Sequence, residues 1–240
     1  MLRLAFVTGT EPGKWFDRFA QRTDHGGLMP LDSEDPLALL EAGEADLALA
    51  RLPDARVGQD HHVVRLYAEA RGVAVPKGSI FAEAGDPVGA ADLAGEMVQY
   101  RVPASGEVDV AQVRAALAVV AANVGVAIAP RPLLKILSRK QVVPLPLAGD
   151  ADERGEPVPE THIALVWRRE ADSDAIQDFV GTARGRTRNS SRQAAPRRSA
   201  REKTKARQER RAGRARGEQK KTQRDQHRAG RNAGNRRRKR

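Results

Sequence analysis

Several hydroxyl side chains lie in turns between an apolar, strand-like segment and a helix-like segment of the sequence. In such positions they could bind a small anion. Thr8 and Thr10 follow the apolar run LRLAFV and precede a helix-like run that begins at Lys14. Hydroxyls and free backbone N–H groups at such a turn suit a carboxylate, although Thr10 could simply cap the helix. Ser33 occupies a second turn of this kind, where the same two interpretations apply.

Two arginines could supply the positive charge for such an anion. Arg51 directly follows the apolar run DLALA, and Tyr100 with Arg101 ends the run EMVQYR. A guanidinium can hold a carboxylate through two parallel hydrogen bonds, although a surface ion pair is the alternative interpretation of Arg51. The candidate ligand-binding residues are therefore Thr8, Thr10, Ser33, Arg51, Tyr100 and Arg101.

Patterns typical of catalysis and of metal binding are missing from the sequence. The run FVTGTEPGKW has three residues between Gly9 and Gly13, where a phosphate loop needs four, and Trp15 follows Lys14 in place of Ser or Thr. None of the five histidines has a Glu at the spacing of a helical zinc site, and the chain has no cysteine and no G-x-S-x-G. We therefore expect no enzyme activity, no metal and no cofactor.

Charge is divided unevenly along the chain. Residues 186–240 hold 23 of the 42 Lys and Arg but only 4 of the 31 Asp and Glu, a balance of +19. Residues 1–185 hold the remaining 19 basic and 27 acidic residues, a balance of −8. The terminal segment also lacks Val, Ile, Leu, Phe, Trp and Tyr, so it cannot bury enough apolar surface to fold. It is predicted to be a disordered basic tail.

The basic tail suggests contact with DNA or RNA. Its Lys and Arg blocks would neutralise phosphates in a salt-sensitive, sequence-independent way, and it lacks the aromatic residues that stack on bases. The alternative is a solvated tail with loose affinity for any polyanion, including the acidic domain itself. The candidate nucleic-acid-binding residues are Arg197, Arg198, Arg210, Arg211, Arg236, Arg237 and Arg238.

Strand-like and helix-like segments alternate in residues 1–185. The expected strands are residues 2–8, 27–31, 46–52, 71–76, 96–100, 125–130, 142–147 and 162–168. The expected helices are residues 14–23, 35–43, 107–123, 131–140 and 173–185. This alternation predicts an α/β fold with largely parallel strand pairing.

The apolar run VVAANVGVAIAP, residues 119–130, belongs to this core. Spanning a bilayer takes about 20 apolar residues, and this run ends at Pro130 with Asn123 inside it. We interpret it as a helix end, a turn at Asn123 and Gly125, and a buried strand. With no signal peptide visible either, we expect a cytoplasmic protein without membrane contact.

Several segments, in order, resemble the effector (substrate-binding) domains of LysR-type transcriptional regulators. They are LRLAFVTG at the start, EAGEADLALARLP, RGVAVPKGSIFAEAGDPVGAADLAGE, VVAANVGVAIAPRPL and finally HIALVWRR. The resemblance covers residues 2–184. It implies a type-2 periplasmic-binding-protein fold, with two α/β lobes, two crossovers and a ligand cleft between the lobes.

The resemblance also implies boundaries. The first lobe would comprise residues 1–71 and 143–185 and the second lobe residues 72–142, with bending near 71–73 and 142–143. Residues 186–240 would be the tail. Ligands of open α/β sheets bind at the carboxyl ends of the strands, which here would face the cleft. The family further suggests a homodimer.

Two features depart from the family. Met1 falls where an effector domain begins, so the winged helix-turn-helix is expected to be absent, unless the gene model has lost it. The second lobe looks short, since only residues 99–108 separate EMVQY from the next helix.

The predicted function is a non-enzymatic regulatory module that binds a small organic anion. The alternative is a nucleic-acid-associated protein whose folded part mediates protein–protein contacts.

Overall fold

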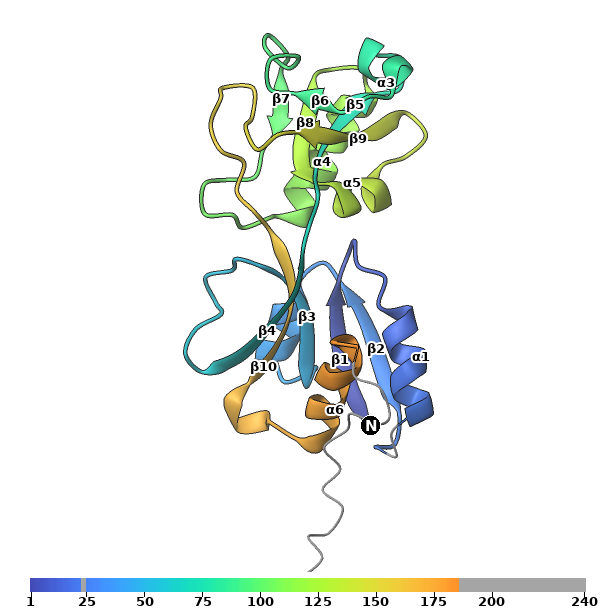
Figure 1. Cartoon of the computed structure of the whole chain (residues 1–240), viewed down its shortest axis with the longest axis vertical. Coiled ribbons are helices and arrows are strands. Elements are labelled where there is room, and N and C mark those ends of the chain that lie inside the picture. Colours follow the sequence, from blue (N-terminus) through green and yellow to red (C-terminus); the bar gives the residue numbers. More distant parts are fainter. Residues whose placement is uncertain (23–24, 186–240) are drawn as a thin grey trace, which may run out of the picture. The chain divides into compact units, whose positions relative to one another are not determined.

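The structure is a computed structural model that describes residues 1–22 and 25–185, all of which belong to one compact unit (Figure 1). The predicted basic tail and its seven candidate nucleic-acid-binding arginines lie outside the described residues. Two five-stranded sheets organise the described part of the chain. We call each sheet, together with its helices, a lobe.

The first lobe is built on a sheet with the strand order β2-β1-β3-β10-β4. Its strands are β1 (Leu2–Val7), β2 (Leu28–Ser33), β3 (Leu47–Leu52), β4 (His61–Ala68) and β10 (His162–Arg168). Its helices are α1 (Gly13–Arg22), α2 (Pro36–Glu41) and α6 (Asp174–Ala183), with a 3-10 turn at Arg169–Ala171. Strand β1 runs parallel to β2 and β3, whereas β10 runs antiparallel to β3 and β4.

Helices cover both faces of this sheet, which explains why all six residues of β3 are buried. Leu47 and Leu49 of β3 share a cluster with Phe19 of α1 and Phe179 of α6, whose rings meet edge to face at 5.5 Å. Alternate β3 residues pack on the other face, where α2 contributes Leu37 and Leu40. The carboxyl end of β1 and the start of α1 are thereby held on a rigid sheet.

The second lobe is built on a sheet with the strand order β6-β9-β5-β8-β7. Its strands are β5 (Arg71–Pro76), β6 (Val88–Gly89), β7 (Val98–Tyr100), β8 (Val126–Pro130) and β9 (Val142–Ala148). Its helices are α3 (Ile80–Ala84), α4 (Val110–Ala121) and α5 (Arg131–Leu137). Asp109 caps α4 by accepting a hydrogen bond from the backbone N–H of Gln112, at 3.0 Å.

The α/β class with two sheets agrees with the expected fold, but the expectation of largely parallel pairing is wrong. Four of the eight strand pairings in the described residues are parallel and four are antiparallel. The antiparallel pairings all involve β5 or β10, the first strand after each passage of the chain between the sheets. Simple alternation of strands and helices does not reveal such a passage.

The expected boundary at residue 143 also needs correction. Strand β9 (Val142–Ala148) pairs with β5 and β6, so it belongs to the second sheet. The chain therefore returns to the first lobe through residues 149–161, and its outward passage lies between β4 and β5 (Figure 1). Bending at residues 142–143 would break the second sheet, so these residues are not a junction between the lobes.

The run VVAANVGVAIAP has the predicted structure. Helix α4 ends at Ala121, Asn123 and Gly125 adopt positive φ angles of 65° and 66°, and β8 begins at Val126. A Cβ at Gly125 would lie 1.9 Å from the carbonyl oxygen of Met97. This close approach allows β7 and β8 to pair immediately after the turn.

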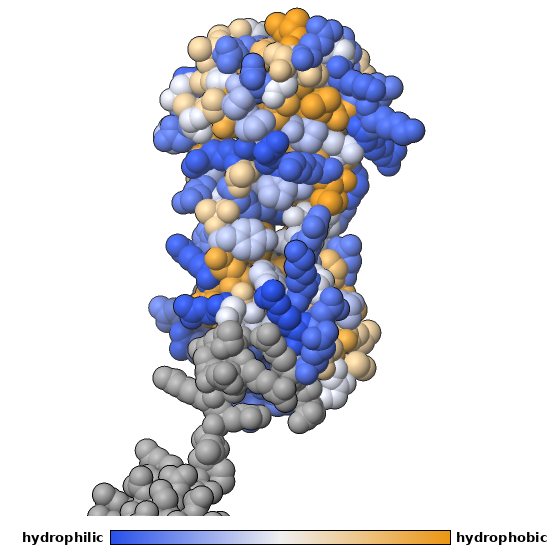
Figure 2. Space-filling view, turned by 45° about the vertical axis from the view of Figure 1, so that its right-hand side comes forward, coloured by the Kyte–Doolittle hydropathy of each residue, from blue (hydrophilic) through white to orange (hydrophobic). Residues whose placement is uncertain are grey.

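Hydrophilic side chains dominate the surface shown in Figure 2, and apolar side chains form smaller separate patches between them. Within residues 1–22 and 25–185, no helix has the length and apolar character needed to span a membrane.

Candidate functional site

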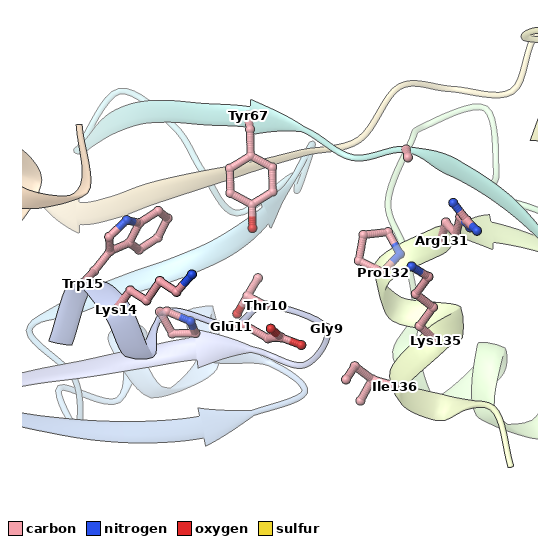
Figure 3. Close-up of a pocket in the computed structure, with 12 residues that line it drawn as sticks. Gly9, Thr10, Glu11, Lys14, Trp15, Tyr67, Arg131, Pro132, Lys135 and Ile136 are labelled. Atoms are coloured by element: carbon pink, nitrogen blue, oxygen red, sulfur yellow. The ribbon is translucent and has the colours of Figure 1, made fainter. Parts of the chain in front are cut away.

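The strongest candidate site is a cavity of about 480 Å³ between the carboxyl end of β1 and helix α5 (Figure 3). We call it the α5 cavity. The turn after β1, the first turns of α1 and the link between β4 and β5 form its first-lobe walls. It is lined by Gly9, Thr10, Glu11, Pro12, Lys14, Trp15, Tyr67, Ala70, Arg131, Pro132, Lys135 and Ile136.

The turn after β1 approaches α5 closely because it contains Gly9. Gly9 has a φ of +97°, and an added Cβ would lie 3.1 Å from Cα of Leu133 and 3.2 Å from Nη2 of Arg51. Thr10 donates its hydroxyl to the carbonyl oxygen of Val7 at 2.7 Å, and its backbone N–H donates to the same oxygen at 3.2 Å. The Thr10 hydroxyl therefore stabilises the turn and can still accept a hydrogen bond from a ligand.

Positive charge predominates in the α5 cavity. Lys14, Arg131 and Lys135 line it together with a single carboxylate, Glu11. None of these four side chains forms an ion pair with another described residue. Nε of Arg131 is buried and has no hydrogen-bond acceptor among the described residues. A buried donor without a partner is costly, so this atom needs an acceptor from a ligand or from water.

Aromatic and apolar side chains complete the cavity. Figure 3 shows Trp15 and Tyr67 on the first-lobe side and Pro132, Lys135 and Ile136 across from them on α5. Partial burial and the nearby charge of Glu69 raise the pKa of Tyr67, so its hydroxyl stays protonated and can donate a hydrogen bond. The cavity can therefore hold an apolar body and bind negative groups at its polar positions.

Arg51 lies beside this cavity, where it forms a buried ion pair and not the surface ion pair of the alternative interpretation. Its Nε and Nη2 donate to Oε2 and Oε1 of Glu69 at 2.7 and 3.0 Å, and Nη2 also donates to the carbonyl oxygen of Thr8 at 3.2 Å. Thr161 donates its hydroxyl to Oε2 of Glu69 at 3.0 Å. Both charged side chains are buried, 4% and 1% exposed, so this is an internal pair rather than a surface pair. Nη1 of Arg51 is also buried and has no acceptor among the described residues.

The other four predicted ligand-binding residues lie outside the α5 cavity. Ser33 Oγ accepts a hydrogen bond from the backbone N–H of Asp35 at 3.0 Å, and the hydroxyl of Thr8 donates to the carbonyl oxygen of Ser33 at 3.4 Å. Tyr100 and Arg101 line a separate cavity of about 600 Å³. Arg101 pairs there with Glu153, whereas the buried hydroxyl of Tyr100 has no hydrogen-bond partner among the described residues.

Carboxylates outnumber cations in the other two cavities. The 600 Å³ cavity is lined by three acidic and two basic residues, namely Asp54, Glu107, Asp109, Arg56 and Arg101. Arg51 lines a third cavity of about 350 Å³, where the charged residues are Glu34, Asp35, Asp54, Asp109, Arg51 and Arg56. Both arginines of this third cavity are paired with carboxylates, although Nη1 of Arg51, like Nε of Arg101 in the 600 Å³ cavity, has no hydrogen-bond acceptor among the described residues. Of the three cavities, the α5 cavity therefore suits an anion best.

Comparison with known proteins shows which family part of the chain resembles. Residues 97–188 match the family model described as "LysR substrate binding domain". This part of the chain is therefore similar to a LysR substrate-binding domain. A search of curated proteins gives no significant match. The match confirms, over these residues, the resemblance seen in the sequence.

Solved structures of regulators share the fold of this chain. The BenM effector binding domain with its effector benzoate is 19% identical, with a TM-score of 0.55 over 76% of this chain and 90% of that one. Full-length CbnR with its target DNA is 17% identical, with a TM-score of 0.55 over 78% and 69% of the two chains. Reduced OxyR from N. meningitidis is 20% identical, with a TM-score of 0.51 over 76% and 92%.

Of the six ligand-binding residues predicted from the sequence, only Thr10 lines the α5 cavity. Sequence reasoning missed Lys14, Trp15, Tyr67, Arg131 and Lys135. The spacing of four between Arg131 and Lys135 puts both cations on one face of α5, which is a signal that the sequence does contain. Tyr67 gave no signal, because β4 was not recognised as a strand.

Arg56 lines both of the acidic cavities and forms ion pairs with two acidic residues. It pairs with Asp35 at 2.8 Å and with Asp54 at 2.7 Å. Hydrogen bonds from Arg56 lower the pKa of Asp35, although partial burial opposes this effect. Partial burial raises the pKa of Asp54, but the bonds and charge of Arg56 outweigh it, so the pKa is lowered overall.

Replacing Arg56 by Met should therefore lower stability at neutral pH but not in acid. A lowered folded-state carboxyl pKa stabilises the fold above its ordinary value of about 3.9, and this contribution is lost as pH falls through the lowered pKa. Because the side chains are partly exposed, we expect a difference of about 1 kcal/mol or less. Urea unfolding of both proteins at pH 7 and pH 3 measures it, and an equal difference at both pH values would contradict the assignment.

Proposed function

We propose that this domain binds a small organic anion in the α5 cavity and acts as a non-enzymatic regulatory module. One observation carries the proposal, namely the group of cationic side chains that have no acidic partner in the described part of the chain. Lys14 and Lys135 flank the space, and the buried Nε of Arg131 lacks an acceptor. A carboxylate would satisfy this donor and offset the charge.

The relatives support an organic anion. The BenM effector binding domain has benzoate as its effector, a molecule that combines an aromatic ring with one carboxylate. The α5 cavity offers the same two kinds of contact, since Trp15 and Tyr67 are aromatic and Arg131 is cationic. Its volume of about 480 Å³ lies within the range of roughly 300–1,000 Å³ found for small-molecule sites.

A regulatory role rests on where the cavity lies. Its walls come from both lobes, and α5 begins at the outward link, where the backbone N–H of Arg131 donates to the carbonyl oxygen of Ala70 at 2.7 Å. A ligand that contacts both walls would favour the arrangement in which the walls are close, and would so shift the population of conformations. We further propose a cytoplasmic location, and assembly as a homodimer.

The composition of the chain favours a second function. Residues 186–240 carry a balance of +19, which suits salt-dependent contact with the phosphates of DNA or RNA. In that case the folded domain would mediate protein–protein contacts and the α5 cavity would bind no effector.

Thermal unfolding of the full chain tests the proposal with a panel of small carboxylates, amino acids and aromatic acids. A ligand at about 100 times its dissociation constant stabilises by about 2.7 kcal/mol, which shifts Tm by roughly 5–10 °C for a domain of this size. We expect at least one organic anion to produce such a shift.

Two matched variants locate the effect. Arg131→Met should abolish the shift, because Met keeps the side-chain stem but removes the cation. Lys140→Met removes an exposed cation outside the cavity and should leave the shift unchanged. Both variants retain the basic tail, so ions bound to the tail cannot explain a difference between them. A panel without any shift, on folded protein, would refute the proposal and favour the second function.

A further inference from the structure

The charges of the α5 cavity specify more about its ligand than that it is an anion. This inference rests on the proposed function and extends it to the class of ligand. Three cations and one carboxylate line the cavity, which leaves an excess of two positive charges. Lys14, Lys135 and Glu11 are exposed, whereas Arg131 is half-buried, so a monoanion that pairs with Arg131 would leave Lys14 and Lys135 free to bind a second negative group. A ligand with two negative charges would balance the cavity.

The cations stand on two different walls. Lys14 belongs to α1 in the first lobe, whereas Arg131 and Lys135 belong to α5 in the second. Figure 3 shows Lys14 on one side of the space and both α5 cations across from it. Glu11 extends from the turn after β1 into the space between the two walls. Two separated negative groups fit this arrangement better than one compact group.

The space between the charged walls suits a flat apolar body. Trp15 and Tyr67 contribute ring surfaces on the first-lobe side, and Pro132 and Ile136 contribute apolar surface on α5. The protonated hydroxyl of Tyr67 adds a hydrogen-bond donor to the first-lobe wall. An inorganic dianion would satisfy the charges but leave these apolar walls uncovered.

We infer that the α5 cavity binds a dianionic small molecule with a flat apolar body, one negative group facing Lys14 and the other facing Arg131 and Lys135. Such a ligand contacts both lobes through charge, so it holds the two walls together more strongly than a ligand with one charged end.

Isothermal titration calorimetry of the full chain with four anions tests this inference. Terephthalate carries two carboxylates at opposite ends of a ring, phthalate carries them side by side, benzoate carries one, and sulfate has no apolar body. We expect terephthalate to bind about tenfold more tightly than benzoate, since one charge-assisted hydrogen bond is worth about that factor. Phthalate should resemble benzoate, and sulfate should bind most weakly.

Variants then assign the two ends. Lys14→Met should weaken terephthalate binding about tenfold and bring it to the level of benzoate, because it removes the cation of the first-lobe wall. Lys140→Met, which leaves the cavity and the tail unchanged, should alter neither affinity.

The outcomes separate this inference from the proposed function. Equal affinities for benzoate and terephthalate, both lost in Arg131→Met, would overturn the dianion and leave the anion site intact. Binding that Arg131→Met does not change would overturn both, since the anions would then be bound elsewhere. Tightest binding by sulfate would also overturn the inference, because the apolar body would contribute nothing.

Discussion

Replacing Glu69 by Leu should lower the free energy of unfolding by about 3–5 kcal/mol, because it leaves a buried guanidinium without its partner. Arg51 and Glu69 are among the few charged residues buried in the described part of the chain, and two hydrogen bonds join them. In a domain of this size the loss corresponds to a fall in Tm of roughly 6–20 °C. Chemical unfolding of the two proteins at neutral pH measures it.

The double variant Arg51→Met with Glu69→Leu is the control. Apolar replacement of a whole buried ion pair is often nearly neutral, so we expect it to regain most of the stability that the single variant loses. A single variant within about 1 kcal/mol of the wild type would contradict the buried pair. The pair matters for the site because it ties the link between β4 and β5 to the end of β3, beside the α5 cavity.

The second large effect is expected at Gly125. Gly125→Ala would place a Cβ 1.9 Å from the carbonyl oxygen of Met97, at a φ of +66°. Since the backbone around β7 or β8 must move to relieve this contact, we expect a loss of about 3 kcal/mol or more. Denaturant unfolding monitored by circular dichroism measures the loss.

Gly43 provides a matched control for Gly125. It has a similar φ of +70°, but a Cβ there would meet nothing within 4 Å. Gly43→Ala should therefore cost only the strain of the left-handed conformation, about 1–2 kcal/mol. If both substitutions cost the same, the close approach of Met97 to Gly125 would be ruled out as the cause.

The sequence predicted the elements of the core well, because their signals are local. The turn at Asn123 and Gly125 follows from residue types that tolerate positive φ, and the buried strands follow from apolar runs. Strand β4 was missed because it starts with two histidines and lies at the edge of its sheet, half exposed. The antiparallel pairings were missed because they depend on how the chain passes between the sheets.

The site was harder to predict because it depends on contacts between distant segments. Arg51 contacts Glu69 only because the end of β3 lies beside the end of β4 in the fold. The residues next to Arg51 in the sequence therefore do not reveal this pair. Gly9 reaches Leu133 across more than a hundred residues of sequence. Thr10 was predicted from local turn chemistry and does line the α5 cavity. Arg131 and Lys135, the cations on α5, could be assigned to the same cavity only from the three-dimensional structure.

The central claim is that an organic anion binds in the α5 cavity, and the two tryptophans of the chain allow a direct test. Trp15 lines the cavity, whereas Trp167 is buried in the first-lobe core and donates its indole N–H to Asp172 at 3.0 Å. Titration of terephthalate into the labelled full chain, followed by nuclear magnetic resonance of the two indole N–H groups, reports on both positions. Trp15→Phe assigns the signals.

We predict a saturable shift of the Trp15 signal, an unmoved Trp167 signal, and loss of the shift in Arg131→Met. Terephthalate binding that leaves the Trp15 signal in place, or a Trp15 shift that persists unchanged in Arg131→Met, would contradict the account.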